Sequence, residues 1–217
     1  MKQISKSREP RSLEEHRAKG GDFDGLHKSK LRKQLIKEQG NICCYCMRRI
    51  KNEEPIISTK IEHFKSQKNY PELQLDYQNL LLACTGNEGN PKMMQTCDTF
   101  KGEKDLSFNP ADKGRNIESL IKYLNNGEIR SMNPLLDKEL DDVLHLNTKD
   151  LRDTRAGYYK MFDDKIKQKG NEYKGKQIPR SFFETEKEQL LTKFGGKFPE
   201  FCMVGVYLLN KRLSKLN

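Results

Sequence analysis

Apolar residues recur at helical spacing between residues 26 and 39. Leu31, Leu35 and Ile36 form one stripe there, and lysine and arginine side chains flank it. Because residues three and four apart share one face of a helix, this spacing predicts an amphipathic helix. Gly40 follows the pattern directly and is well suited to end the helix.

The stretches on both sides of this helix are irregular. Residues 1–25 contain Pro10 and a glycine pair, and we expect a leader there with a short helix near residues 12–19. After the helix the periodicity breaks into short pieces. Segments 42–50 and 56–64 are read as two short strands, the second of them β-branched and apolar.

A hairpin and several helices are predicted for the rest of the chain. An Asn-Asn-Gly turn between two apolar segments predicts a small hairpin over 121–132. A short helix is expected around 97–103 and a loop at 170–176. The longer helical patterns cover about 138–143, 148–168, 181–193 and 199–213.

These patterns predict an α+β protein in three parts. Residues 1–40 form an N-terminal leader and helix, and residues 41–112 form a core of short strands and turns. Residues 113–217 form a mostly helical region that either packs on the core or docks a partner.

Composition and charge narrow the classes of protein. Charged residues make up 33% and hydrophobic residues 34% of the 217 positions, and no stretch approaches the roughly 18 apolar residues of a membrane span. The first residues lack the apolar core of a secretory signal, so we expect a cytoplasmic location and no membrane partner. The net charge of +10 favours nucleic acid as a partner, because phosphates attract basic side chains. On charge alone, a generic basic protein is the alternative.

The cysteines are clustered in a way that indicates a metal site. The six are Cys43, Cys44, Cys46, Cys84, Cys97 and Cys202. Cys43 and Cys46 form a CxxC pair whose thiolates can bind one zinc ion at about 2.3 Å. Cys84 and Cys97 are the candidates for the second pair, so we predict structural zinc held by these four, with Cys44 as an alternative ligand. Cys202 lies in an apolar helical pattern and is expected in the core, and buried cysteines without metal are the duller reading.

A histidine and a carboxylate stand side by side between the two cysteine pairs. Glu62 and His63 end an apolar strand pattern, Asn79 follows, and Asp98 and Lys101 come directly after Cys97. Histidine titrates near neutral pH and can take a proton from water. Carboxylate oxygens are ligands that magnesium and manganese prefer. Each residue also has a purely structural alternative: His63 as a structural histidine, Asn79 as a turn residue, Asp98 as a helix cap and Lys101 as a solvated lysine.

The order of these motifs resembles the HNH endonuclease superfamily. CxxC, Glu-His, Asn-Leu-Leu and Cys-Asp-x-x-Lys follow one another along the chain. Longer segments resemble the PtuB-like, retron-associated (Septu-type) HNH family, and they are 9–13, 39–50, 61–64, 75–81, 97–99 and 109–112. The likeness covers residues 1–112 and is loose beyond them. It implies a ββα-metal (HNH) core with a structural zinc knuckle, flanked by the N-terminal helix and the mostly helical C-terminal region.

The resemblance implies a role for each site residue. His63 would be the general base, and Asn79 would hold the His63 ring or its loop. Glu62 and Asp98 would bind a catalytic Mg²⁺ or Mn²⁺, and Lys101 would contact a phosphate. Asp98 stands where the motif has histidine, and Glu62 is one carbon longer than the aspartate of many relatives. Neighbouring residues of a strand face opposite sides, so Glu62 and His63 share one site only if the strand ends or bulges there.

The resemblance also implies a biological setting. Such proteins are the nuclease subunits of antiphage defence systems of the Septu or retron type, cutting DNA or RNA, with transfer RNA among the candidates. Their partners are an ABC-type (PtuA-like) ATPase and, in some systems, a retron reverse transcriptase with its RNA–DNA product. This chain has no Walker motif, so ATP dependence would come from the partner.

Several surface assignments remain open between two readings. Arg48 and Arg49 are candidate phosphate contacts, with a solvated face as the alternative. Segment 198–209 is a candidate docking surface, with simple packing as the alternative. Two rival functions are a zinc-stabilised nucleic-acid-binding module without catalysis and a partner-interaction subunit whose HNH centre is degenerate.

Overall fold

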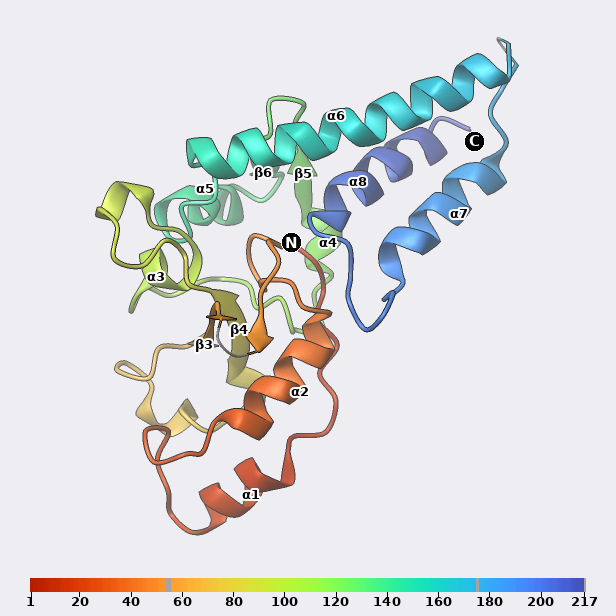
Figure 1. Cartoon of the computed structure of the whole chain (residues 1–217). Coiled ribbons are helices and arrows are strands. Elements are labelled where there is room, and N and C mark those ends of the chain that lie inside the picture. The colour runs from red at the N-terminus through yellow and green to blue at the C-terminus, as the bar shows by residue number, and fades with distance from the viewer. Residues whose placement is uncertain (54–55, 175, 217) are drawn as a thin grey trace.

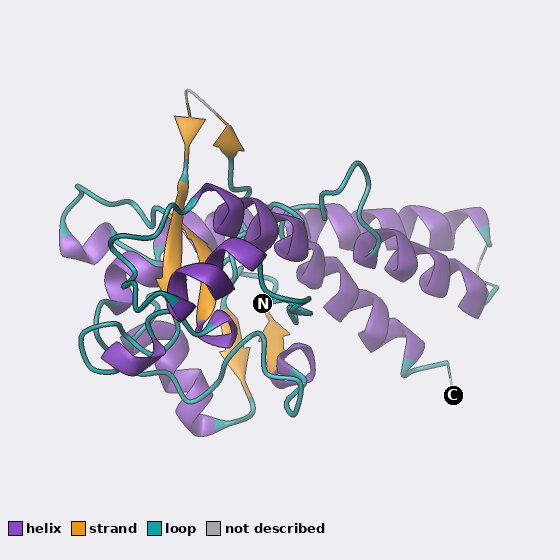
Figure 2. Cartoon of the chain, turned by 90° about the horizontal axis from the view of Figure 1, so that it is seen from below, coloured by secondary structure: helices purple, strands orange, loops and turns teal. Residues whose placement is uncertain are grey.

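The computed structural model describes residues 1–53, 56–174 and 176–216 (Figure 1). The described part of the chain contains three separate two-stranded antiparallel sheets; helices lie around two of them, and the third strand pair projects beyond the helices (Figure 2). The small sheets and the many helices make this a mixed α/β arrangement. The predicted parts 1–40, 41–112 and 113–217 stay predictions as domain boundaries.

The two N-terminal helices form where the sequence predicts them. Helix α1 covers Arg11–Ala18 and helix α2 covers Ser29–Gln39. Gly40 ends α2 in the left-handed conformation, with φ 57°, which glycine adopts without steric cost. Leu31 and Leu35 are buried as the apolar stripe requires.

The central sheet consists of β3 (Thr59–His63) and β4 (Leu80–Cys84), with His63 opposite Leu80. Every residue of β4 is buried, because helix α2 covers it. The Gln39 side chain of α2 bonds the backbone of Leu82 in both directions, at 2.7 and 2.8 Å. These bonds satisfy the free edge of β4 and fix α2 on the sheet.

Residues 42–50 do not form the predicted strand. The Ile42 and Arg49 backbones make a single antiparallel bridge, and the residues between them form a tight turn. The prediction was wrong because the apolar side chains of this segment are buried by a turn rather than by a sheet. Segment 56–64 forms two strands instead of one, β2 (Ile56–Ile57) and β3, and β1 (Asn52–Glu53) pairs with β2.

Short helical turns connect the sheet to the rest of the chain. They are η1 (Pro71–Leu73), η2 (Tyr77–Asn79), η3 (Lys92–Met94) and the five-residue helix α3 (Cys97–Lys101). Helix α3 confirms the prediction around 97–103 and follows β3 and β4 in the order strand, strand, helix. It contacts β4.

The C-terminal part is mostly helical, as predicted. The hairpin of β5 (Ile121–Tyr123) and β6 (Ile129–Ser131) is confirmed, and its Asn-Asn-Gly turn lies against a long helix. The helices are α4 (Ile117–Leu120), α5 (Pro134–Asp142), α6 (Lys149–Glu172), α7 (Arg180–Leu191) and α8 (Cys202–Leu213). Helix α6 continues to Glu172, so the loop expected at 170–176 begins later.

Helices α6, α7 and α8 pack together and extend away from the central sheet (Figure 1). The apolar residues of α8 from Cys202 to Leu209 are buried except for the partly buried Tyr207, so segment 198–209 mainly packs within the chain rather than presenting a free apolar face. Cys202 is buried in this helix as expected, and burial raises the pKa of its thiol to about 11. In the described part of the chain, no helix is both long and apolar enough to cross a membrane.

Candidate metal centre and catalytic cleft

Four buried cysteines meet at one point of the core. The Sγ atoms of Cys43, Cys46, Cys84 and Cys97 all lie within 4.8 Å of one another. Cys43 is 3.9 Å from Cys97 and Cys46 is 3.8 Å from Cys84, sulfur to sulfur. Four thiolates at about 2.3 Å from one tetrahedral zinc ion are about 3.8 Å apart. The cluster therefore has the dimensions and the donor set of a structural zinc site.

The first cysteine pair lies in a tight turn that its backbone builds. The Cys43 amide donates to the Arg48 carbonyl at 2.9 Å, and the Met47 amide donates to the Cys43 carbonyl at 3.1 Å. Met47 has φ 65°, a left-handed conformation that costs a side chain about 1–2 kcal/mol. The turn holds both sulfurs on one side, as a metal knuckle requires.

The second pair is separated by a long loop that folds back on itself. Cys84 ends β4 and Cys97 begins α3. The Thr96 amide donates to the Gly86 carbonyl at 2.9 Å, and a Cβ at Gly86 would collide with the Thr96 carbonyl. This close approach closes the loop and brings Cys97 to the cluster despite its distance from Cys84 in the sequence.

The thiols of the cluster do not ionise independently of one another. Burial opposes ionisation of Cys43, but hydrogen bonds from the neighbouring thiols hold its pKa well below the ordinary value. Hydrogen bonds to Cys43 in turn raise the pKa of Cys84 and of Cys97 well above the ordinary value. Burial raises the pKa of Cys44, the alternative ligand, well above its ordinary value. Cys44 is buried outside the four-sulfur cluster, and its amide donates to the Leu82 carbonyl at 3.1 Å.

A cleft of about 360 Å³ adjoins the cluster, because Asp98 follows the ligand candidate Cys97 directly. Its lining brings together Glu62, His63, Asp98 and Lys101. His63 is the last residue of β3, so the strand ends where the sequence requires it to end if Glu62 and His63 are to share one site.

His63 is held in one orientation and in one tautomer. Its Nε2 lies 3.0 Å from the Gln74 carbonyl oxygen, which can only accept, so Nε2 carries the proton in the neutral ring. Burial is the main cause that lowers the pKa of His63 below its ordinary value. The ring is therefore neutral near pH 7, and Nδ1 keeps a lone pair that can accept a proton.

Two residues that the sequence did not reveal hold this histidine. Phe23 meets the His63 ring edge-on, with ring centroids 4.4 Å apart. The Gln74 side chain accepts from the Phe23 amide at 2.9 Å. Gln74 therefore holds the His63 ring through its backbone carbonyl and holds Phe23 through its side chain. The sequence carries no clear signal for either contact. Phe23 lies in the irregular leader, and Gln74 contacts His63 through its backbone, which every residue type has.

Glu62 lies in a buried polar network. Its Oε1 accepts from the Tyr45 hydroxyl at 2.7 Å and pairs with the Lys101 ammonium at 2.9 Å. The side chains of Glu62 and Lys101 are each 1% exposed. Burial and then the nearby Asp98 carboxylate raise the pKa of Glu62 well above its ordinary value, against the opposing effect of Lys101. Tyr45, inside the CxxC turn, joins the cysteine cluster to this carboxylate, a role that the sequence did not show.

Asn79 closes the loop that follows His63. Its Oδ1 accepts from the Lys65 amide at 2.7 Å, and its Nδ2 donates to the Lys65 and Leu73 carbonyls at 2.9 and 3.1 Å. The side chain is buried and bonds the loop, not the ring. Of the two roles that the sequence left open, the contacts are those of a loop brace.

The three basic residues singled out for phosphate contact have partners within the chain. Lys101 donates to the His63 carbonyl at 3.0 Å in addition to its pair with Glu62. Arg48 pairs with Asp150. Arg49 donates to the Phe198 carbonyl at 2.7 Å and to the Gly40 and Asn41 carbonyls at 3.3 Å. Their contact with nucleic acid stays a prediction.

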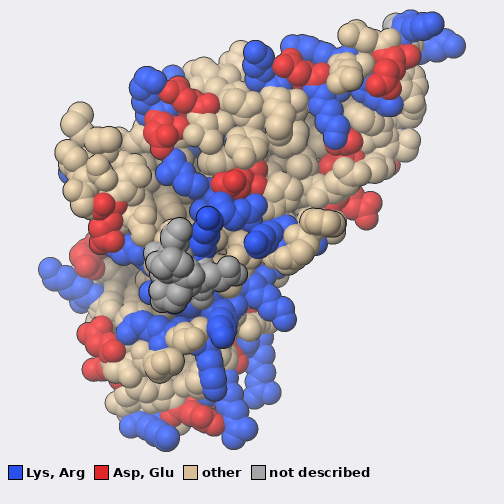
Figure 3. Space-filling view, in the orientation of Figure 1, with Lys and Arg blue, Asp and Glu red and all other residues tan. Residues whose placement is uncertain are grey.

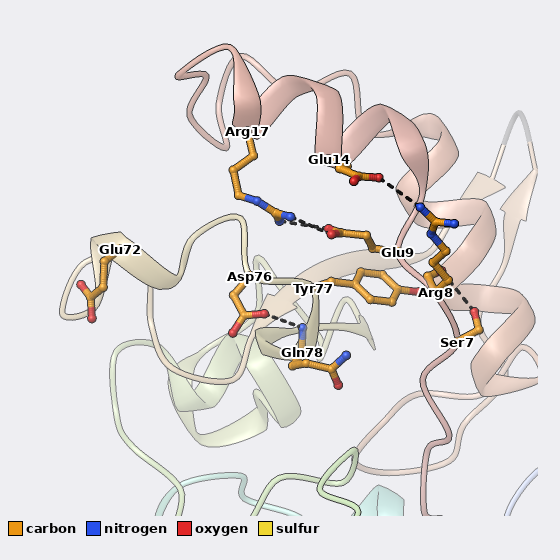
Figure 4. Close-up of a pocket in the computed structure, with 9 residues that line it drawn as sticks. All are labelled: Ser7, Arg8, Glu9, Glu14, Arg17, Glu72, Asp76, Tyr77 and Gln78. Atoms are coloured by element: carbon orange, nitrogen blue, oxygen red, sulfur yellow. Dashed lines mark hydrogen bonds and ion pairs between the residues drawn. The ribbon is translucent and has the colours of Figure 1, made fainter.

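A second cleft of about 510 Å³ lies between the leader and the η2 turn (Figure 4). Its charges are largely paired with one another: Arg17 with Glu9, and Arg8 with Glu14. Asp76 accepts from the Gln78 amide at 2.9 Å. This pairing favours a structural role over ligand binding.

Comparison with known proteins gives one informative match. No protein-family model matches the chain. Over 117 residues the chain is 30% identical to the Septu protein PtuB of Bacillus thuringiensis. The match covers 54% of this chain, and the chain spans only 40% of that relative's length. The chain is therefore similar to a Septu protein over about half of its own length.

Proposed function

We propose that this chain is a metal-dependent nuclease of the HNH type, with a ββα-metal core formed by β3, β4 and α3. The observation that carries the proposal is the cleft in which neutral His63, fixed through Nε2, faces the same space as Glu62 and Asp98. Metal-assisted hydrolysis of a phosphodiester requires a general base and ligands for a divalent cation, and the histidine and the two carboxylates can supply these.

His63 acts as the general base in this proposal. Nδ1 takes a proton from the attacking water, while the Gln74 carbonyl and Phe23 keep the ring in position. Asn79 braces the loop after His63 and so limits movement of the strand end. The low pKa of His63 keeps the base unprotonated at neutral pH.

Glu62 and Asp98 are the ligands proposed for Mg²⁺ or Mn²⁺. Tyr45 and Lys101 both contact Oε1 of Glu62, which leaves Oε2 for the cation or for a water bound to it. Hard carboxylate oxygens suit these ions. When bound, the cation would polarise the scissile phosphate and stabilise the leaving oxygen. The zinc cluster plays a structural part, because it fixes Cys97 and therefore the start of the helix that carries Asp98.

We further propose that the chain serves as the nuclease subunit of a Septu-type antiphage defence system. The similarity to a Septu protein supports this setting, and the motif resemblance adds control by an ABC-type ATPase and, in retron systems, by a reverse transcriptase with its RNA–DNA product. DNA and RNA, including transfer RNA, are the substrate classes to compare.

A cleavage assay tests the enzyme proposal. Zinc-loaded protein is incubated with plasmid DNA, single-stranded DNA and total RNA. Each reaction is run with and without Mg²⁺ or Mn²⁺, and with and without the proposed ABC-type ATPase partner. Cutting that needs the cation and disappears in His63→Ala is expected. His27→Ala is the matched control. Because His27 lies outside the cleft, this variant should cut as the wild type does.

A binding or docking subunit without catalysis is the second candidate. The specific observation that favours it is the buried Glu62–Lys101 pair, which occupies one oxygen of a proposed metal ligand. If purified protein with its partner cuts no substrate in any metal, and His63→Ala still protects cells from phage, this candidate replaces the nuclease.

A further inference from the structure

A basic surface lies outside the proposed catalytic cleft. A pocket of about 580 Å³ is lined by Lys33 and Ile36 of α2, by Asn41, Arg49, Ile50 and Lys51 of the turn region, and by Lys197. Every charged side chain among these described residues is cationic. Lys33, Lys51 and Lys197 are exposed, and Figure 3 shows Lys and Arg side chains gathered over α2 on this face.

An exposed aromatic side chain stands at the edge of this pocket. Phe194 is 92% exposed, the highest value among the large apolar residues in the described part of the chain. It is paired with the pocket residue Lys197 by two backbone hydrogen bonds of 3.0 Å. Gly195 and Gly196 between them have φ 55° and 78°, as a two-residue type I′ turn requires.

The turn is mounted firmly, so the exposure of Phe194 is a property of the fold. The Lys193 ammonium donates to the Lys37 and Glu38 carbonyls at 2.5 and 2.9 Å. On the other side, the Phe198 amide donates to the Gly40 carbonyl at 2.9 Å. Both ends are thus fixed to the last turn of α2 and to Gly40. A Cβ at either turn glycine would meet nothing within 4 Å, so the tip projects into solvent.

We propose that this turn and pocket form a nucleic-acid platform, in which Phe194 stacks on an unpaired base while Lys33, Lys51 and Lys197 bind the adjoining phosphates. The inference deepens the proposed nuclease function and rests on it. Fully exposed phenylalanine costs free energy in water, whereas aromatic stacking beside a cationic groove is how proteins bind single strands. A protein-docking surface fits less well, because the charged side chains that line the pocket beside Phe194 are all cationic.

The platform lies within reach of the catalytic cleft. The Lys51 amide donates to the Ser58 side chain at 2.9 Å, and the Ser58 amide donates back to the Lys51 carbonyl at 3.0 Å. Ser58 precedes β3, whose last residue is His63. Five residues of extended chain span about 17 Å. A single strand that follows β3 could therefore contact Lys51 at one end and His63 at the other.

The absence of tryptophan from the whole sequence makes the platform testable by fluorescence. Phe194→Trp in the His63→Ala background places a single fluorophore at the tip and prevents cutting. The probes are a DNA strand, an RNA strand and a DNA duplex, each of about 12 nucleotides or base pairs, within the size range of single-strand sites. Met132→Trp is the matched control, since Met132 is 70% exposed and lies outside the platform.

Quenching is expected for Phe194→Trp with the single strands and not for Met132→Trp. In the same background, Phe194→Ala should weaken single-strand binding about 5- to 150-fold, the range that one stacked base contributes. Lys33→Gln with Lys51→Gln should lower the salt slope by roughly 1.4, whereas Lys113→Gln with Lys160→Gln, two exposed lysines outside the pocket, should leave it unchanged. Circular dichroism verifies that every variant is folded.

Unchanged fluorescence with all three probes would overturn the proposal. Wild-type affinities in Phe194→Ala would overturn it too. The readout is binding by a protein that cannot cut, so its result is separate from the nuclease proposal. Quenching in a protein whose wild type never cuts would support the platform and reject catalysis.

Discussion

At the scale of single residues, the protonation state of His63 has a measurable consequence. Burial lowers its pKa below the ordinary histidine value, and the base works only when it is unprotonated. The rate of cleavage should therefore fall as the pH drops through this lowered pKa, and it should be constant from there through neutral pH. A pH–rate profile in a fixed concentration of Mg²⁺ measures it. An acidic limb centred at or above 6.5 would contradict the assignment, and His27→Ala should reproduce the wild-type profile.

Lys101 has a structural role that the sequence did not reveal. Its ammonium lies in the core, where it pairs with Glu62 and donates to the His63 carbonyl. Lys101→Met should lower the free energy of unfolding by about 3–5 kcal/mol, because it leaves a buried carboxylate without its partner. Adding Glu62→Gln should recover part of the loss.

Urea unfolding measures both variants. Lys138→Met is the control, because its pair with Asp142 is exposed and contributes about 1 kcal/mol or less. A loss in Lys101→Met no larger than in this control would show that Lys101 is not part of the core network.

At the scale of elements, the four cysteines join the CxxC turn, the end of β4 and the start of α3. Replacing one ligand should loosen all three. Cys97→Ser should bind less zinc than the wild type and lose several kcal/mol of stability, roughly 10 °C in Tm for a chain of this size. Metal analysis and thermal unfolding test this. Cys44→Ser, buried but outside the cluster, should keep its zinc, and equal zinc content in both variants would rule out the assigned ligand set.

The elements also show which parts of the fold and of the candidate site can be predicted from the sequence. Periodic helices such as α2 and α6 and the Asn-Asn-Gly hairpin were predictable, because their signals are local. The strand expected at 42–50 was wrong, because apolar residues around a CxxC turn have the composition of a strand. The motif named His63, Glu62 and Asp98, and the structure places them in one cleft. The support by Phe23 and Gln74 was not predictable, since it depends on chain segments that meet only in the fold.

At the scale of the whole molecule, the positive charge should control association. The net charge is +10 and the isoelectric point about 9.2. If the three lysines of the platform contact a single strand, the logarithm of the affinity should fall with the logarithm of the salt concentration at a slope of about −2. Fluorescence anisotropy of a labelled strand over a range of KCl concentrations measures this slope. A slope near zero would exclude phosphate contacts as the main source of affinity.

The adjacency of Cys97 and Asp98 couples two kinds of chemistry across one peptide bond. Cys97 is a soft sulfur donor in the four-cysteine cluster, and Asp98 is a hard oxygen ligand proposed for the catalytic cation. Oxidants attack thiolates far more readily than carboxylates. Oxidation of the cluster would release Cys97 and, about 3.8 Å along the chain, shift the aspartate beside it. If the chain is the proposed nuclease, oxidation should impair both the cluster and the cation site, so its redox history belongs among the variables that an experimenter controls.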